Sequence, residues 1–272
     1  MDLQVVASSL PEKEIQSLFH RLLGDARKNI EAYPELDPNG LHNARKNIKR
    51  IRSLLRLLRL PDIKQDRREL NTRLSNAGKM LFGYRDIEVV MTFFTDLKES
   101  TKKRSPGIQK ALEKVVAATS TSQFLTPSES SFHQTRLQFK DALDEIESRF
   151  NRVSLQHFEW ADLDTAFEKR LKRMRKCAKP YGKEPDEEAL HQLRKRIKDI
   201  FYQQQFLQGR LGISSDSISQ TKAIESSLGS ARDCDLAMAY ITQLDEATLS
   251  LNEEPILRRC IKRQREQSIG QL

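Results

Sequence analysis

The chain has 272 residues, of which 38% are hydrophobic and 31% are charged. A chain of this length buries enough apolar surface to fold without disulfides or a structural metal, which excludes a small stapled domain. Its 47 lysines and arginines against 38 aspartates and glutamates leave a net charge of +9. That excess predicts attraction to a polyanion, without choosing among nucleic acid, anionic lipid and other candidates.

The same sequence excludes several cellular settings. Its three cysteines lie far apart and match no metal-ligand spacing, and an odd number without a secretory signal favours a reducing compartment. No apolar run is long enough to cross a bilayer, and the first ten residues lack the basic start of a signal peptide. We therefore expect a soluble, cytoplasmic protein.

Apolar residues recur every three or four positions along most of the chain, which predicts an all-α fold. In the first half we expect helices over about 11–33, 41–60, 63–84, 86–99, 108–118 and 132–151. Pro34 and the turn from Asp37 to Gly40 end the first helix, and Pro61 ends the second. Loops are expected over 102–107 and 119–131.

The second half repeats this pattern in a shorter form. We expect helices over about 162–179, 186–209, 216–230, 233–244 and 254–267. Pro180 and Gly182 end the first of these helices.

Two segments of the chain are near copies of each other. Residues 41–49 and 190–198 are identical at six of nine positions, and an Arg-Asp pair follows each copy, at Arg85-Asp86 and at Arg232-Asp233. Paired landmarks in the same order predict an internal duplication. We interpret the chain as a single domain over 1–272 with repeats over about 1–150 and 151–272.

The Arg-Asp pairs are expected at helix junctions. Asp86 and Asp233 are predicted to cap the helices that follow them, because a carboxylate at a helix start accepts hydrogen bonds from free backbone N–H groups. Arg85 and Arg232 either pair with a carboxylate or extend an anion site, and the sequence does not decide between these roles.

Residues 41–60 separate into two faces when they are placed on a helix. An apolar stripe runs from Leu41 to Leu58, and a row of cations lies about 100° away. The row comprises His42, Arg45, Lys49, Arg52 and Arg56. Lys46 lies at its border. The segment holds seven basic residues and no acidic one, and adjacent like charges on a helix repel by roughly a few tenths of a kcal/mol per pair. A bound anion would offset this repulsion.

The second copy carries a shorter row of the same kind, formed by His191, Arg194 and Lys198 with Lys195 at its border. Phe201 and Gln205 replace the counterparts of Arg52 and Arg56. Guanidinium groups bind phosphate through paired hydrogen bonds and lysines supply mobile charges, so such rows suit a repeating chain of phosphates. Further candidate cations lie on other predicted helices: Arg21, Arg170, Arg173 and Lys262.

A run of cations on a helix is often only a solvated face. Here the histidine and the basic spacing occur in both copies, and solubility alone does not require a histidine at the same place twice. We therefore favour a binding site over a solvated face.

At these residues the sequence resembles the CHAD family, the conserved-histidine α-helical domain. The shared motifs are His42-x-x-Arg45-Lys46-x-x-Lys49-x-x-Arg52, His191-x-x-Arg194-Lys195-x-x-Lys198 and the two Arg-Asp pairs. The resemblance covers nearly the whole chain. It implies two four-helix bundles related by a pseudo-twofold axis around a basic cavity. It also implies non-catalytic binding of inorganic polyphosphate and association with polyphosphate granules.

Two features depart from the most common pattern of this family. Phe201 stands where relatives usually have a basic residue, which shortens the reach of the second row. Many relatives are fused to a CYTH triphosphatase domain, and no strand with the Glu-x-Glu-x-Lys signature of that domain is apparent here. The chain therefore resembles a stand-alone CHAD protein.

Two other functions stay open as alternatives. A nucleic-acid binder shares the need for cations, but proteins that stack on bases interleave aromatic and basic residues, and residues 41–60 contain no aromatic one. Phe201 and Tyr202 are the aromatic candidates near the second row. An enzyme is less favoured, because no glycine-rich phosphate loop, metal-spaced histidines or nucleophile motif is present. We expect no cofactor, metal or membrane partner, and other polyanions remain candidate ligands.

Overall fold

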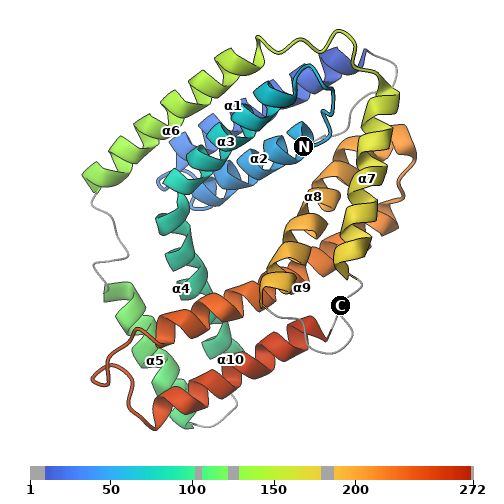
Figure 1. Cartoon of the computed structure of the whole chain (residues 1–272). Helices are drawn as coiled ribbons and strands as arrows, with labels where there is room; N and C mark the ends of the chain where they lie inside the picture. The colour runs from blue at the N-terminus through green and yellow to red at the C-terminus, as the bar shows by residue number, and fades with distance from the viewer. Residues whose placement is uncertain (1–9, 102–105, 122–128, 179–186, 271–272) are drawn as a thin grey trace. The chain divides into compact units, whose positions relative to one another are not determined.

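The computed structural model describes residues 10–101, 106–121, 129–178 and 187–270, without the side chains of residues 82–88, 120, 121, 129, 130 and 187. The described residues form ten α-helices and no strand, so the predicted all-α fold is confirmed (Figure 1). The helices belong to two compact units, residues 1–81 with 132–225 and residues 82–131 with 226–272. Within the described ranges, no helix is both long and apolar enough to cross a bilayer.

The first unit contains five whole helices, most of a sixth and the beginning of a seventh. They are α1 (Pro11–Ala32), α2 (Gly40–Leu55), α3 (Lys64–Met80), α6 (Glu129–Phe150), α7 (Trp160–Ala178), α8 (Glu187–Leu211) and the first part of α9 (Ser215–Ile241). Helix α2 packs against α1, α3 and α8, and α7 packs against α8. Helix α2 is therefore the central element of this unit.

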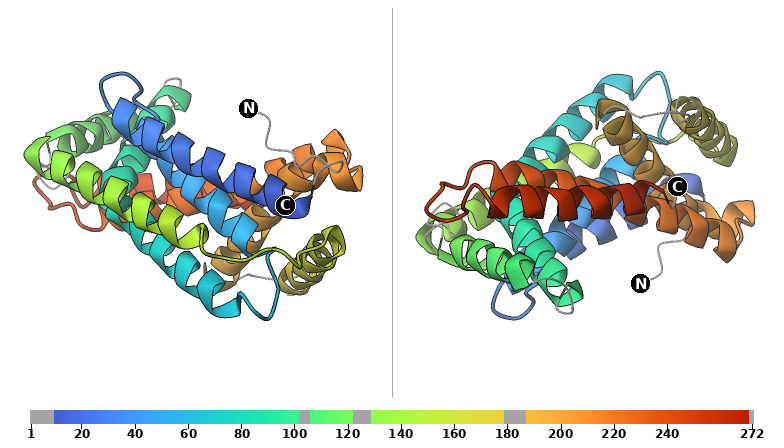
Figure 2. Two further views of the ribbon diagram at one scale, coloured as in Figure 1. Left: turned by 90° about the horizontal axis from the view of Figure 1, so that it is seen from above. Right: turned by 90° about the horizontal axis from the view of Figure 1, so that it is seen from below.

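Helix α1 packs against both α2 and α6. Its buried face supplies eight residues to the core, and Phe19 on that face stacks against Phe150 of α6. On the outer side, Arg27 donates hydrogen bonds to Asp144 and Glu147 of α6 over 2.6 Å each. Figure 2 shows α1 and α6 running side by side. These two acidic residues therefore stabilise the packing of α6 against α1.

The start of α2 lies unusually close to α1, and Gly40 makes this approach possible. A Cβ atom on Gly40 would lie 2.3 Å from the backbone oxygen of Asn29 and 2.9 Å from Cβ of Tyr33. Such distances are far shorter than any normal contact, so only glycine fits at this position.

Helices α7 and α8 are joined by a side-chain cluster at one end. Arg210 of α8 forms an ion pair of 2.6 Å with Asp164 of α7. Its guanidinium carbon also lies 4.9 Å from the ring centroid of Trp160, the single tryptophan of the chain. This is a favourable cation–π distance, and it fixes the start of α7 against the end of α8.

The second unit consists of α4 (Phe82–Ser100), α5 (Pro106–Thr121), the last part of α9 and α10 (Glu253–Ile269). Apolar residues from all four helices form one core cluster that includes Phe94, Leu112, Cys234 and Leu257. Lys114 pairs with Glu253 at 2.8 Å on its periphery. The unit thus combines two helices from the predicted first repeat with residues from the second, although the repeat boundary near residue 150 itself stays a prediction.

Several predicted element boundaries are wrong. The sequence predicts two helices over 216–230 and 233–244, but α9 runs without interruption from Ser215 to Ile241. Asp233 lies inside α9 and Asp86 lies inside α4, so neither occupies the predicted capping position. Helix α2 ends at Leu55 rather than near residue 60, and the residues directly after it form a turn.

The two predicted loops are shorter than expected where the structure describes them. Helix α5 begins at Pro106, inside the loop predicted over 102–107, and residues 102–105 lie outside the described ranges. The connection predicted over 119–131 is reduced from both sides, because α5 extends to Thr121 and α6 begins at Glu129. Residues 122–128 also lie outside the described ranges.

Candidate anion-binding site

The apolar stripes predicted on the two matched helices are buried. On α2 the stripe from Leu41 to Leu55 is no more than 2% exposed, and on α8 the stripe from Leu190 to Leu207 is no more than 7% exposed. This prediction is confirmed. The burial of these stripes fixes the rotation of each helix and therefore the direction in which its cations point.

On α2 the predicted row of cations runs along the side that faces α3. Arg45 donates a hydrogen bond to the backbone oxygen of Leu81 over 3.4 Å, and Arg52 donates to Asn71 of α3 over 3.1 Å. His42 and Lys49 are exposed. At the end of the helix the row turns toward α8, because Arg56 pairs with Asp199 at 2.6 Å.

The cations of α8 are more buried than those of α2. His191, Arg194 and Lys198 are partly buried, whereas Lys195 is exposed. Lys198 forms an ion pair of 2.8 Å with Glu225 of α9. Phe201 and Tyr202 are 8% and 3% exposed, so the aromatic residues of this helix belong to the protein interior.

The two matched helices touch each other directly. Ser53 of α2 donates a hydrogen bond to the backbone oxygen of Asp199 over 3.0 Å, and Gln203 of α8 donates to the backbone oxygen of Ser53 over 3.1 Å. Ser53 and Gln203 are both fully buried. These reciprocal bonds hold α2 and α8 together and bring their cations into two clusters, each built around one carboxylate.

The first of these, called the Glu225 cluster, comprises Lys46, Arg50, Lys198 and Lys222. Lys198 and Lys222 lie 2.8 and 2.6 Å from the two carboxylate oxygens of Glu225. Arg50 and Lys198 lie 5.7 and 6.0 Å from the ring centroid of Tyr202. The cluster therefore gathers cations of α2, α8 and α9 around one acid and one buried aromatic ring.

The charges of the Glu225 cluster are incompletely neutralised. Burial lowers the pKa of Lys46, and the positive charges of Arg50, Lys222 and Lys198 lower it further. Burial raises the pKa of Glu225, but the charges and hydrogen bonds of Lys198 and Lys222 outweigh this effect and bring it to about 2. The carboxylate is thus ionised at neutral pH, yet Glu225 and Asp25, whose charge acts on Arg50, face four positive charges.

The second, called the Asp199 cluster, consists of guanidinium groups around Asp199. Four arginines act on Asp199, namely Arg52, Arg56, Arg170 and Arg196, and two more, Arg59 and Arg173, act on Arg170. They come from α2 and the residues after it, from α7 and from α8. Burial raises the pKa of Asp199, although the charges of Arg56, Arg170, Arg196 and Arg52 oppose this effect.

Arg170 is the most buried cation of the Asp199 cluster. It is 7% exposed, and it donates a hydrogen bond to the backbone oxygen of Arg56 over 3.3 Å. Burial lowers its pKa to about 10, and the charge of Arg59 adds to this effect. A buried guanidinium normally has a carboxylate partner, so a guanidinium among other cations indicates a place suited to an anion.

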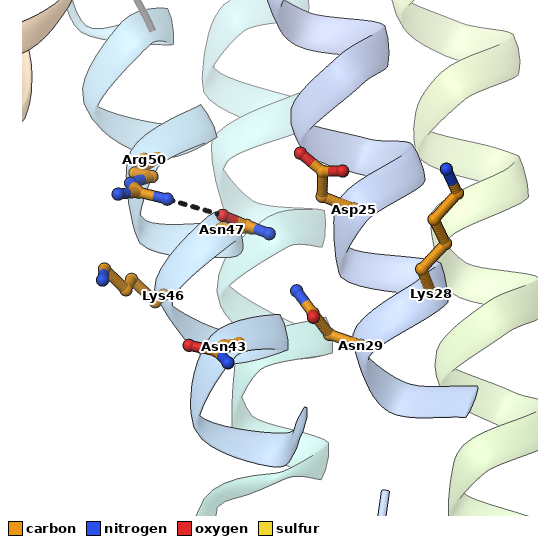
Figure 3. Close-up of a pocket in the computed structure, with 7 residues that line it drawn as sticks. All are labelled: Asp25, Lys28, Asn29, Asn43, Lys46, Asn47 and Arg50. Atoms are coloured by element: carbon orange, nitrogen blue, oxygen red, sulfur yellow. Dashed lines mark hydrogen bonds between the residues drawn. The ribbon is translucent and has the colours of Figure 1, made fainter. Parts of the chain in front are cut away.

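A groove between α1 and α2 adjoins the Glu225 cluster. It has a volume of about 280 Å³ and is lined by Asp25, Lys28, Asn29, Asn43, Lys46, Asn47 and Arg50. In Figure 3 Asp25, Asn29 and Asn47 lie between the two helices, whereas Lys46 and Arg50 point from the side of α2 away from α1. Arg50 donates a hydrogen bond to Asn47 over 3.1 Å.

The remaining predicted cations are not members of these clusters. On the two matched helices they are His42, Arg45, Lys49, His191, Arg194 and Lys195, although the charge of Arg194 acts on Lys198. Arg21 is exposed on α1. Arg232 on α9 is partly buried and Lys262 on α10 is exposed, and both belong to the second unit. Arg85 lies on α4, and its side chain is outside the described part of the structure.

Several cluster residues were not predicted from the sequence. Arg50 and Arg59 lie in the basic run of residues 41–60 but outside its predicted row, so the run itself is the signal that could have found them. Lys222, Glu225 and Asp199 give no such signal, because they meet α2 only through the packing of α8 and α9. Arg67 of α3 was also missed, and the charge of Arg59 acts on it.

Comparison with known proteins gives a consistent picture. Residues 17–242 match the family described as CHAD domain. In structure the chain is similar to PptA from Streptomyces chartreusis, with a TM-score of 0.68, 14% identity and coverage of 97% of this chain and 98% of that one. It is also similar to the CHAD domain from the plant Ricinus communis, with a TM-score of 0.55, 20% identity and coverage of 100% and 89%. No curated protein matches the sequence.

Proposed function

Because the chain belongs to the CHAD domain family, we propose that it binds inorganic polyphosphate without catalysis, along the cations that α2 and α8 bring together. One observation carries this proposal. The two matched helices touch at Ser53 and Gln203, and the cations that flank this contact outnumber the carboxylates Glu225 and Asp199 placed among them. A polyanion would supply the missing negative charge.

The chemistry of the two clusters suits phosphate. Lysine ammonium groups follow a flexible anion as mobile point charges, whereas guanidinium groups bind phosphate oxygens through paired hydrogen bonds. Partial burial strengthens these interactions, since the local dielectric constant is lower than that of water. A fully ionised phosphate chain carries only acceptors along its length, which matches a surface that presents many donors.

The site residues predicted from the sequence stay part of this proposal. They are His42, Arg45, Lys46, Lys49, Arg52, Arg56, His191, Arg194, Lys195 and Lys198, to which we add Arg50 and Lys222. The family likewise supports a pseudo-twofold arrangement of two bundles around a basic cavity, and association with polyphosphate granules. Other polyanions remain candidate ligands, which competition against polyphosphate distinguishes.

Nucleic acid is a weaker candidate ligand. Proteins that bind single strands without sequence preference stack bases on exposed aromatic rings. Tyr202 and Phe201, the aromatic residues nearest the cations of α8, are 3% and 8% exposed and lie against Arg50, Lys198 and Lys222 instead. Their rings are therefore not available to bases.

The proposal is tested by calorimetry with polyphosphate of defined length. The variant carries Lys46→Gln, Lys49→Gln and Arg194→Gln, which remove cations while the ion-pair partners of Glu225 and Asp199 stay in place. We expect its affinity to fall by at least about tenfold, equivalent to about 1.4 kcal/mol. Circular dichroism verifies that the variant keeps its helices.

A matched control removes the same charge elsewhere. Lys110, Arg259 and Arg263 are exposed residues of the second unit, and their replacement by glutamine is expected to leave affinity within about twofold. Equal losses in both variants would mean that only net charge matters. RNA that displaces polyphosphate at equal phosphate concentration would favour the nucleic-acid alternative.

A further inference from the structure

The Asp199 cluster differs in chemistry from the rest of the basic surface. Its cations are all arginines, whereas three of the four cations of the Glu225 cluster are lysines. Its residues also come from four separate segments, namely α2, the turn after α2, α7 and α8. Guanidinium groups on several packed elements form a rigid set of paired donors, unlike the mobile ammonium groups of lysines.

The donors of this cluster exceed its acceptors. Asp199 accepts a hydrogen bond from Arg56 over 2.6 Å. Arg170 donates to the backbone oxygen of Arg56 instead of to a carboxylate, and its Nε is buried without a hydrogen-bond partner. The Nε atoms of Arg59 and Arg196 are likewise buried and unpartnered. Unsatisfied buried donors are rare in proteins, because each one loses its hydrogen bonds to water.

The charges of the cluster act on one another. The positive charges of Arg59, Arg56 and Arg173 repel that of Arg170, whereas the negative charge of Asp199 attracts it. Arg59 in turn acts on Arg67 of α3. A ligand that fits here must carry several negative charges within a small volume and must have no donors that compete with those of the protein.

Resting on the proposed function, we propose that the Asp199 cluster is a subsite of the polyphosphate-binding surface, with which it shares Arg52 and Arg56, and that it binds a compact phosphate anion of two or three phosphates, either free or as the end group of a longer chain. Its oxygens accept hydrogen bonds from the arginines of the cluster. Asp199 is the internal anion that holds these arginines together when no ligand is bound. A phosphate inside a linear chain carries one negative charge, whereas the phosphates of pyrophosphate and of chain ends carry more. The high density of guanidinium groups therefore favours pyrophosphate and chain ends over chain interiors.

The probe is pyrophosphate, and the measurement is calorimetry on the full chain. Arg59→Gln with Arg173→Gln removes two cluster arginines, one partly exposed and one exposed, so that no fully buried residue is replaced. We expect this variant to bind pyrophosphate at least about tenfold more weakly. The matched control is Lys172→Gln with Arg175→Gln, which removes two exposed cations of α7 outside the cluster. It is expected to bind pyrophosphate as the wild type does.

Asp199→Asn separates a binding role from a purely structural one. Removal of the internal carboxylate leaves more positive charge for the ligand, so we expect pyrophosphate to bind several-fold more tightly. Weaker binding by Asp199→Asn, or equal binding by the arginine variant and its control, would overturn the proposal. Circular dichroism of each variant verifies the helical fold.

The source of the phosphate is assigned by competition against pyrophosphate. A long chain with free ends that displaces pyrophosphate, while the same chain with blocked ends does not, identifies the end group as the ligand. If neither chain displaces it, the ligand is the free anion. Displacement by the blocked chain would show that interior phosphates bind equally well, which contradicts the proposed preference.

Pyrophosphate and long-chain polyphosphate test the two proposals separately. Pyrophosphate binding at the Asp199 cluster by a protein that does not bind long polyphosphate would reject the proposed function alone. Polyphosphate binding that survives Arg59→Gln with Arg173→Gln, together with no binding of pyrophosphate to the wild type, would reject the compact-phosphate site alone.

Discussion

Glu225 and Asp199 each lie among several cations, and their environments differ. Glu225 is 5% exposed and is held by two ammonium groups, which bring its pKa to about 2. Asp199 accepts a hydrogen bond from Arg56, but burial outweighs the attraction of its arginines and its pKa is raised. The ion pairs of Glu225 therefore stabilise the folded chain at neutral pH. For Asp199, burial disfavours the charged form more than its arginines favour it.

The Glu225 ion pairs predict a pH-dependent stability. Since the folded pKa of Glu225 lies below its ordinary value of 4.5, its contribution is complete above about pH 4.5 and is lost as the pH falls toward 2. The shift corresponds to roughly 3 kcal/mol, but burial lowers the pKa of Lys198 and offsets part of this gain. We expect Glu225→Gln to lower the free energy of unfolding by about 2 kcal/mol at pH 7.

Urea unfolding at a series of pH values measures this effect. The difference between the wild type and Glu225→Gln should shrink between about pH 4.5 and the acid limit of the experiment. Glu254→Gln is a suitable control, because Glu254 pairs with Arg258 of its own helix in the second unit and is partly exposed. A difference that stays constant with pH would contradict the assignment.

The sequence predicted the cations of the site better than their partners. The apolar stripe of α2 fixed the direction of Arg45 and Arg52, because a helix has one rotation that buries its stripe. The partners Asp199 and Glu225 could not be predicted, since they meet these cations through contacts between segments far apart in the chain. Local periodicity carries no information about such contacts.

Among the elements, α9 shows how a local pattern misleads. The Arg232-Asp233 pair predicts a helix junction, yet buried residues continue at helical spacing through Leu228, Ala231, Cys234 and Ala237. Burial of this continuous stripe stabilises one long helix. Gly229 does not interrupt it, because a glycine inside a helix weakens it by only about 1 kcal/mol.

The close approach of α1 and α2 predicts a large effect at Gly40. We expect Gly40→Ala to lower the free energy of unfolding by at least about 2 kcal/mol, because the added Cβ would meet the backbone of Asn29 and has no room to move. Thermal or urea unfolding measures the change.

Gly229→Ala is the matched control for this prediction. A Cβ at Gly229 meets nothing within 4 Å, and the residue lies inside α9. We expect this substitution to stabilise the chain by about 0.5–1 kcal/mol, through the higher helix propensity of alanine. Equal effects at the two glycines would show that the contact between α1 and α2 is not tight.

For the whole molecule, the distribution of charge predicts a strong dependence of binding on salt. The second unit holds equal numbers of basic and acidic residues, so the net charge of +9 resides in the first unit. Polyphosphate releases its condensed counterions when cations replace them, so its affinity should fall by at least about tenfold between about 50 and about 200 mM salt.

Calorimetry at three salt concentrations measures this slope. The Lys46→Gln, Lys49→Gln, Arg194→Gln variant should show a shallower slope than the wild type, because it displaces fewer counterions from the ligand. An unchanged slope would contradict the placement of the ligand on these cations.

At this scale the helical class follows from periodicity alone, and most helices lie close to where the sequence predicts them. The division into two compact units does not follow from it, because α4 and α5 form one unit with α10 and the end of α9, which lie far along the chain. The predicted duplication is a similarity between two sequence segments and makes no statement about contacts. The division into units therefore does not test its boundary near residue 150.

The contact of Arg210 with Trp160 has a practical consequence. Trp160 is the single tryptophan and it belongs to the first unit, so fluorescence excited at the indole reports on that unit while the second stays optically silent. Circular dichroism, in contrast, records helices of both units. The chain therefore carries its own label for distinguishing whether its two units unfold together or in separate transitions.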